Sequence, residues 1–197
     1  MRILSILLIF LFFGNCNKGN SQNLENDILL KKYFNKNEIN DLKKILLFFD
    51  EEISKNCDDS LISCYQTYFS NVADYYKKRD LYISKKRQLE LFNNISESTF
   101  NKIWRNSQST ISTKTHSKTI DVIMLKYDSD YMNYLKETGT SNLLVFKYSE
   151  MLNDMGAIIH AGMLVYYLFH ANDFDFNNEN ERLIMAIHYM TVSEEFK

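Results

Sequence analysis

Two of the three cysteines could form a covalent cross-link. Cys57 and Cys64 are seven residues apart, and on one continuous helix their Cα atoms would lie about 10.5 Å from each other, too far for a disulfide. A bridge therefore needs a turn of the chain between them, and the polar run 56–60 favours a helix break there. Two alternatives remain: a disulfide, or two free, half-buried thiols. Neither cysteine lies in a Cys-x-x-Cys motif, so a thioredoxin-like redox role is not expected.

The third cysteine, Cys16, ends a segment that has the properties of an export signal. Met1-Arg2 gives a positive start, and residues 3–13 are apolar except for Ser5. As a helix this run would be about 16 Å long, which is too short for a hydrocarbon core of about 30 Å but typical of a secretory signal. The sequence therefore predicts export rather than a membrane-spanning helix at this end.

The segment Phe13-Gly14-Asn15-Cys16 is similar to the end of a bacterial lipoprotein signal, in which the cysteine thiol receives a diacylglycerol before cleavage. Asn15 is larger than the glycine or alanine that is usual there. We expect residues 1–15 to be removed, and acyl chains such as palmitate on Cys16 to hold the mature protein to a lipid bilayer. A plain secretory signal and an uncleaved anchor are the alternatives.

The residues after Cys16 predict a tether. Residues 18–26 are mostly polar and suit a flexible link between lipid and domain. They lack the acidic cluster that resembles a surface-export signal in Bacteroidota lipoproteins. We therefore expect the protein on the periplasmic face of the outer membrane.

Four histidines occur, at positions 116, 160, 170 and 188. A zinc site commonly uses histidines four residues apart on one helix, and no such pair is present. His188 belongs to the apolar face of the last predicted helix, so we interpret it as a core residue. The histidines therefore predict no metal centre.

The segment from Asp173 to Asn177 places oxygen side chains at alternate positions, as a calcium loop does. The resemblance to an EF-hand ends at its sixth position, which is Asn178 instead of glycine, and at its twelfth, which is Ile184 instead of glutamate. Asp173, Asp175 and Asn177 are therefore only weak metal candidates. An acidic helix start is the preferred interpretation.

No catalytic motif is present in the sequence. It contains no Gly-x-Ser-x-Gly, no phosphate-binding glycine loop and no His-Glu-x-x-His. The acidic pairs Glu51-Glu52 and Glu194-Glu195 are adjacent in sequence, so the two carboxylates of each pair diverge around a helix. We expect no cofactor, and we favour a protein that is not an enzyme.

Apolar residues recur at helical spacing through most of the chain. One stripe predicts a helix from Asn37 to Lys55, capped by Asn37 or Asn40. Similar patterns predict further helices at or near residues 61–76, 84–93, 96–104, 129–137, 141–153, 157–170 and 178–190. Residues 105–119 lack an apolar face and predict a loop, while 120–127 leaves a strand open. The expected fold class is all-α, with a single irregular bundle of about seven helices.

The expected domain organisation has three parts. Residues 1–15 form the lipoprotein signal peptide. Residues 16–36 hold the lipidated cysteine, the polar tether and a first helical segment, and residues 37–197 form the helical domain. The absence of proline fits helices joined by short turns.

Charge and aromatic content limit the partners. Loss of Arg2 with the signal changes the formal net charge from −2 to −3, and no basic stripe is present, so we expect no nucleic acid. Thirteen tyrosines and fourteen phenylalanines favour a core with aromatic edges, and an exposed subset would mark a binding surface.

Four segments carry a resemblance to known proteins: 42–53, 63–69, 98–104 and 181–190. Together they resemble a group of small, uncharacterised helical lipoproteins of Bacteroidota. The resemblance spans Leu42 to the C-terminus and implies export and a lipid anchor. It implies no activity, cofactor or catalytic residue.

These observations favour a membrane-anchored, periplasmic, non-catalytic binding protein with a protein partner. A toxin-immunity protein is one version of this hypothesis. Two alternatives remain: an envelope hydrolase with a dispersed site of histidines and carboxylates around His160, His170 or His188, and a structural assembly factor of the outer membrane.

Overall fold

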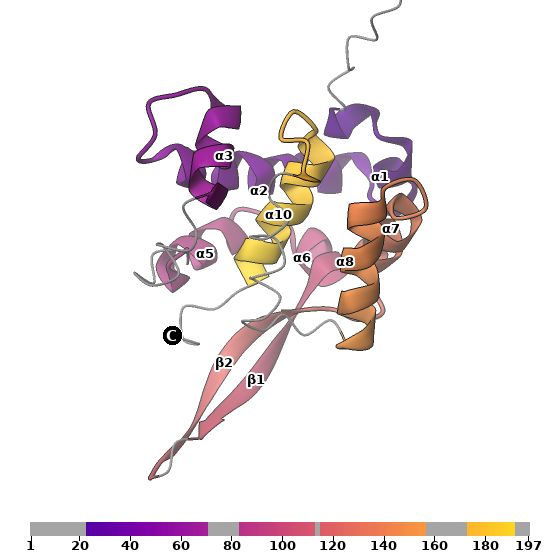
Figure 1. The fold of residues 1–197 in the computed structure, drawn as a ribbon. Coiled ribbons are helices and arrows are strands. Elements are labelled where there is room, and N and C mark those ends of the chain that lie inside the picture. Colours follow the sequence, from indigo (N-terminus) through magenta and orange to yellow (C-terminus); the bar gives the residue numbers. More distant parts are fainter. Residues whose placement is uncertain (1–22, 71–82, 113–114, 157–172, 192–197) are drawn as a thin grey trace, which may run out of the picture.

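The computed structural model describes residues 23–70, 83–112, 115–156 and 173–191 (Figure 1). The helices are η1 (Leu24–Asn26), α1 (Ile28–Tyr33), α2 (Lys36–Ser54), α3 (Leu61–Ser70), α5 (Lys85–Phe92), α6 (Glu97–Ile103), α7 (Asp130–Thr138), α8 (Leu143–Asp154) and α10 (Glu179–Thr191). The strands are β1 (Trp104–Ser112) and β2 (Ser117–Leu125). The predicted helix at 157–170 and the second half of the one at 61–76 lie outside the described residues.

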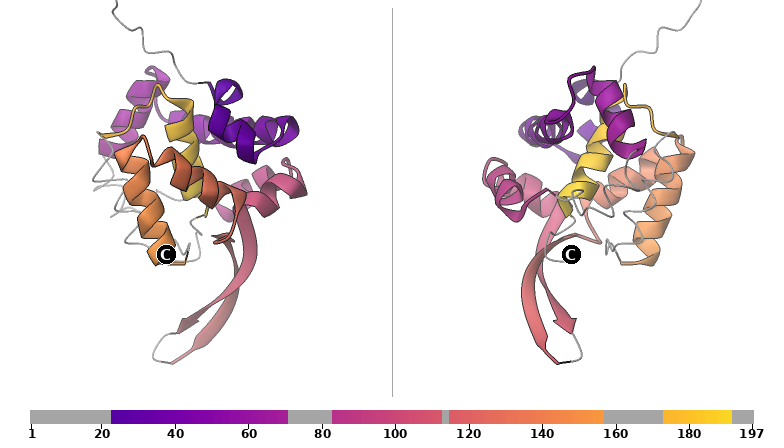
Figure 2. Two further views of the ribbon diagram at one scale, coloured as in Figure 1. Left: turned by 90° about the vertical axis from the view of Figure 1, so that its right-hand side faces the viewer. Right: turned by 60° about the vertical axis from the view of Figure 1, so that its left-hand side comes forward.

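The two strands show that the prediction of an all-α fold is wrong. They pair antiparallel, from Trp104 opposite Leu125 to Ser112 opposite Ser117, where the sequence predicts a loop at 105–119. The hairpin leaves the helical cluster and extends away from it (Figures 1 and 2). An antiparallel ribbon satisfies half of its backbone groups by its own pairing, so its outer part needs no apolar face to form. Because β1 is mostly polar, its sequence shows no apolar pattern that would predict a strand.

Local capping explains where α2 begins. Asn35 accepts hydrogen bonds from the backbone of Asn37 and Glu38, and the Glu38 side chain accepts one from the backbone of Asn35. This capping box starts the helix at Lys36, so the predicted caps Asn37 and Asn40 are wrong. The predicted apolar stripe of α2 is buried along its whole length.

Helix α10 is the central element of the core. All of its residues from Asn180 to Thr191 are buried, and α2 packs against it. A helix that is covered on every side must bury any polar residue it contains. Glu181, Arg182 and His188 are therefore ionisable side chains inside the protein.

The folded part begins within the segment that composition assigns to the tether. Leu24 and Leu30 are fully buried in the core, and the Leu24 backbone N–H donates to Glu179 Oε2 at 3.0 Å. η1 and the outer end of the paired strands, at Ser112 and Ser117, lie at opposite ends of the molecule (Figures 1 and 2). No helix among the described residues has the length and apolar character needed to span a membrane.

Candidate functional site

A polar cavity of about 410 Å³ lies where η1 and α1, the turn between α7 and α8, and the start of α10 meet. We call it the asparagine pocket, because five of its lining residues are asparagines. Its volume is within the range of small-ligand sites. The lining residues are Asn23, Asn26, Asp27, Ile28, Leu29, Thr138, Ser141, Asn142, Val145, Asn178, Asn180, Glu181 and Ile184.

The beginnings of three helices position the polar side chains of this pocket. Asp27 Oδ1 caps α1 by accepting from the backbone N–H groups of Leu29 and Leu30, at 2.7 and 3.0 Å. Asn142 Oδ1 caps α8 in the same way, at 3.0 and 3.1 Å, and Asn178 Oδ1 accepts from the Asn180 backbone at 2.9 Å. Short Asx side chains are favoured at such positions because they satisfy the free amides of the first turn.

The side-chain amides of two asparagines donate to the two carboxylates of the pocket. Asn142 Nδ2 donates to Glu181 Oε1 at 3.0 Å, and Asn180 Nδ2 donates to Asp27 Oδ2 at 2.6 Å. The second oxygen of Glu181 accepts from the Asp175 backbone at 2.9 Å. Both carboxylates are thus held in fixed positions by neutral donors.

One acceptor atom at the pocket has no donor among the described residues. The Oδ1 atom of Asn180 is buried without a hydrogen-bond partner, whereas the buried hydroxyl of Thr138 has the hydroxyl of Tyr134 beside it. Asn180 is only 4% exposed, and the bond from its Nδ2 to Asp27 fixes which way its amide is turned. Because buried polar atoms are nearly always hydrogen-bonded, this acceptor indicates a place for a donor that comes from outside the chain.

The electrostatic environment of the pocket is anionic. Burial raises the pKa of Glu181, and the negative charge of Asp175 adds to the effect, against the hydrogen bonds from the Asp175 backbone and Asn142. The lining residues include two carboxylates and no lysine, arginine or histidine. The site can therefore receive hydrogen-bond donors and positive charge.

Part of the lining of the pocket is apolar. It consists of Ile28, Leu29, Val145 and Ile184, of which Ile28 is 82% exposed. A large aliphatic side chain so exposed beside a cavity is available to the apolar part of a ligand.

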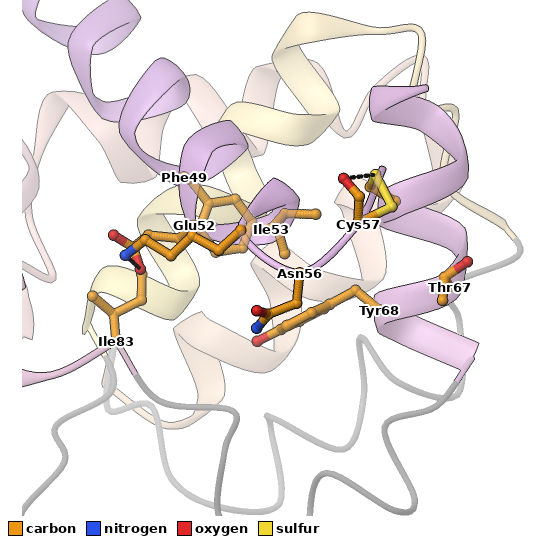
Figure 3. A pocket seen from close by; sticks show the side chains of 10 residues that line it. Phe49, Glu52, Ile53, Asn56, Cys57, Thr67, Tyr68 and Ile83 are labelled. Atoms are coloured by element: carbon orange, nitrogen blue, oxygen red, sulfur yellow. Dashed lines mark hydrogen bonds and ion pairs between the residues drawn. A yellow bond between two sulfur atoms is a disulfide. The ribbon is translucent and has the colours of Figure 1, made fainter. Parts of the chain in front are cut away.

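A second, smaller hollow of about 260 Å³ lies beside the predicted cysteine pair (Figure 3). Cys57 and Cys64 are joined by a disulfide, with their Cα atoms 5.7 Å apart. The bridge forms because α2 ends at Ser54 and α3 begins at Leu61, so the two cysteines do not share one helix. The sequence leaves this pairing open.

The charged groups in the lining of this second hollow have partners within the protein. Glu52 on its wall pairs with Lys55 at 2.6 Å and with Arg87 at 2.8 Å. Phe49 and Ile53 of α2 form one side and Tyr68 of α3 another (Figure 3). We interpret this hollow as an edge of the core that is held together by the disulfide.

The histidines do not form a site among the described residues. His188 is fully buried, and burial lowers its pKa to about 3. Its Nδ1 lies 3.1 Å from the hydroxyl of Tyr148, so it is a core residue that solvent does not reach. His116 is exposed beside the hairpin turn, and His160 and His170 lie outside the described residues.

The weak metal candidates form a turn before α10. Asp175 Oδ1 accepts from the backbone and the side-chain amide of Asn177, both at 3.0 Å, while Asp173 is exposed. In the described ranges no three histidine, cysteine, aspartate or glutamate side chains gather as metal ligands. The segment serves as the helix entrance that brings the Asp175 N–H to Glu181.

No local sequence pattern identifies the asparagine pocket. Asp27, Asn142 and Asn180 each look like an ordinary cap or helix-start residue, and only the fold brings them together. The one local signal is the high density of asparagine at helix starts.

Comparisons with protein-family models, with curated proteins and with solved structures found no match for the chain. The resemblance to helical lipoproteins of Bacteroidota stays a prediction. The function must therefore be argued from the site itself.

Proposed function

We propose that the chain is a lipid-anchored binding protein of the bacterial envelope, which catalyses no reaction and holds a polar group of its partner in the asparagine pocket. The observation that carries this proposal is the buried Asn180 Oδ1 without a donor, in a cavity of ligand size. A complementary donor on a partner would complete its hydrogen bonding.

The arrangement of the carboxylates favours binding over catalysis. Asp27 caps α1 and accepts from the side-chain amide of Asn180, and Glu181 accepts from the side-chain amide of Asn142. These bonds fix the position of both carboxylates. General acid–base work needs a carboxylate or imidazole that reaches the substrate's proton. His188, the one histidine of the envelope-hydrolase hypothesis within the described residues, is fully buried.

One observation supports an envelope location. Disulfides persist in oxidising compartments such as the periplasm, and Cys57 and Cys64 are bonded. Asn23 at the pocket follows Cys16 by seven residues, a span of at most about 25 Å. An acylated Cys16 would thus keep the pocket end of the domain near the bilayer, with the hairpin directed away from it.

The anchor is tested by the intact mass of protein extracted from membranes. The wild type should begin at Cys16 and carry acyl chains, while Cys16→Ser should lack them and leave the membrane fraction. A wild-type protein that keeps residues 1–15, or an unmodified Cys16 thiol, would contradict the anchor.

The binding site is tested by photo-crosslinking in intact cells, with a photoreactive residue at Ile28. Leu47 on α2 serves as the matched control, because it is also a large exposed aliphatic residue, at 65% against 82%. We expect a discrete adduct from position 28, none from position 47, and loss of the adduct when Ser141→Trp fills the rim. The same adducts from both positions, or none from position 28, would contradict a partner at this pocket.

A further inference from the structure

We propose that the asparagine pocket binds a protonated primary amine carried on an alkyl chain. This inference rests on the proposed function, since it names the chemical class that the pocket takes. The amine could belong to a small molecule or to a lysine side chain of the partner protein, and the recognition chemistry is the same for both.

The first argument comes from the counter-charges of buried carboxylates. The described part of the chain has four acidic side chains that are at most 9% exposed. Three of them have a cation of the protein itself nearby: Glu38 with Lys102 at 3.0 Å, Asp41 with Lys44 at 2.6 Å, and Asp50 with Arg182 at 3.3 Å. Glu181 is the fourth, and its hydrogen bonds come only from amides. A buried charge without an opposite charge is costly, so Glu181 is the position where a cation is missing.

Further acceptors lie around Glu181. Asp27 is a second carboxylate at the pocket, and no lysine or arginine contacts it in the described residues. Within the same residues, Asn180 Oδ1 has no donor. An ammonium group carries three donors and no acceptor, which matches a site that presents two carboxylates and an amide oxygen.

The apolar residues of the lining select among cations and donors. Ile28, Leu29, Val145 and Ile184 line the same cavity as these acceptors. A metal ion would need several oxygen ligands, and no suitable group occurs in the described residues. An alkylammonium ion can contact these apolar side chains with its alkyl chain and the acceptors with its ammonium group. A polyol has no purely aliphatic part for the apolar side chains.

Calorimetric titration of the purified mature chain, in a non-ionic detergent, tests the inference. The probes are 1,5-diaminopentane and its uncharged isostere 1,5-pentanediol. We expect the diamine to bind with one-to-one stoichiometry, and the diol to give no measurable heat. Binding of the diol as tightly as the diamine would overturn the inference, because it would show that charge is not recognised.

Glu181→Gln and the matched control Glu38→Gln assign the binding to the pocket. Each removes one buried carboxylate, but Glu38 lies on α2 and has its own lysine. Glu181→Gln should weaken diamine binding by about tenfold or more, the usual loss for one charge-assisted hydrogen bond. Glu38→Gln should stay within about twofold of the wild type. Unchanged binding in a folded Glu181→Gln would overturn the inference.

A measurement on the wild type makes the test independent of variant folding. Addition of the diamine, and not the diol, should shift the side-chain amide NMR signals of Asn142 and Asn180. Absence of any shift at saturating diamine would overturn the inference.

The source of the amine is distinguished by comparing the diamine with an N-acetylated, C-amidated Gly-Lys-Gly peptide. Tighter binding of the peptide assigns a lysine of a protein partner, and tighter binding of the diamine assigns a small molecule. If neither binds while Ser141→Trp still abolishes the crosslink at Ile28, the amine is wrong and the binding function stands.

Discussion

Asp50 and Glu181 are buried carboxylates that meet the same problem in two regions of the core. Burial raises the pKa of each. Asp50 accepts from the Tyr65 hydroxyl at 2.6 Å and lies 3.3 Å from Arg182 Nε, inside a cluster of packed aromatic rings. Glu181 precedes Arg182 on α10. It accepts hydrogen bonds from amides and lines the asparagine pocket.

The difference separates a structural ion pair from a site. Around Asp50 the chain supplies the cation, a phenol and close packing, so the region is complete. Around Glu181 the chain supplies further acceptors and a cavity, and the described lining contains no residue of positive charge. Adjacent positions of one helix point about 100° apart around its axis, so α10 can bring Arg182 to Asp50 in the core and Glu181 to the pocket.

The largest effect should come from removing the cation of the complete region. Arg182→Met leaves Asp50 buried without its partner and the Phe176 carbonyl without its donor at 2.6 Å. We expect a loss of about 3–5 kcal/mol in the free energy of unfolding at neutral pH, measured by urea denaturation. A loss below about 1 kcal/mol would show that Asp50 does not depend on Arg182 and would break the comparison.

His188 extends the comparison to acid pH. Burial lowers its pKa to about 3 from an ordinary value of 6.5. Between these two values His188 is therefore protonated in the unfolded state and neutral in the folded state. Stability should fall as the pH drops from 6.5 towards 3, by about 3 kcal/mol at pH 4. In His188→Gln this part of the acid loss should be absent from the pH series. An identical pH series in both proteins would contradict the assignment.

The disulfide stabilises the side of the core that holds Asp50. Cys64 precedes Tyr65, the phenol that binds Asp50. Cys57→Ser with Cys64→Ser should lower the free energy of unfolding by about 2 kcal/mol, the usual effect of releasing so short a loop. Hydrogen exchange should rise in α3 and remain unchanged at the asparagine pocket. Equal increases in both regions would show that the two are not independent.

The smallest effect should come from Glu181→Gln without ligand. The folded-state pKa of Glu181 lies above 4.5, so its contribution to stability is present below pH 4.5 and is lost as the pH rises through the folded value. The variant should therefore be within about 1 kcal/mol of the wild type at pH 7, and its relative stability should improve from pH 4 to pH 7. A cost near that of Arg182→Met would show that Glu181 is a structural residue like Asp50.

Local sequence signals predict much of the secondary structure. Ser84, Ser96 and Ser129 cap the helices that begin after them, and the buried stripe of α2 follows the apolar spacing. These features depend on residues within a few positions of each other. The strand left open at 120–127 overlaps β2, but β1 escapes prediction because it pairs through its backbone and residues 105–112 are mostly polar.

Local patterns in the sequence account for the starts of α5, α6 and α7, the apolar face of α2 and the different surroundings of the three cysteines. Tertiary packing brings Asn180 to Asp27 across 153 residues and Cys57 to Cys64, and it gives Arg182, but not Glu181 among the described residues, a buried partner of opposite charge. Caps and stripes follow from the chemistry of neighbouring residues. Charge compensation and cavities depend on distant segments packed together, and no local pattern encodes which segments these are.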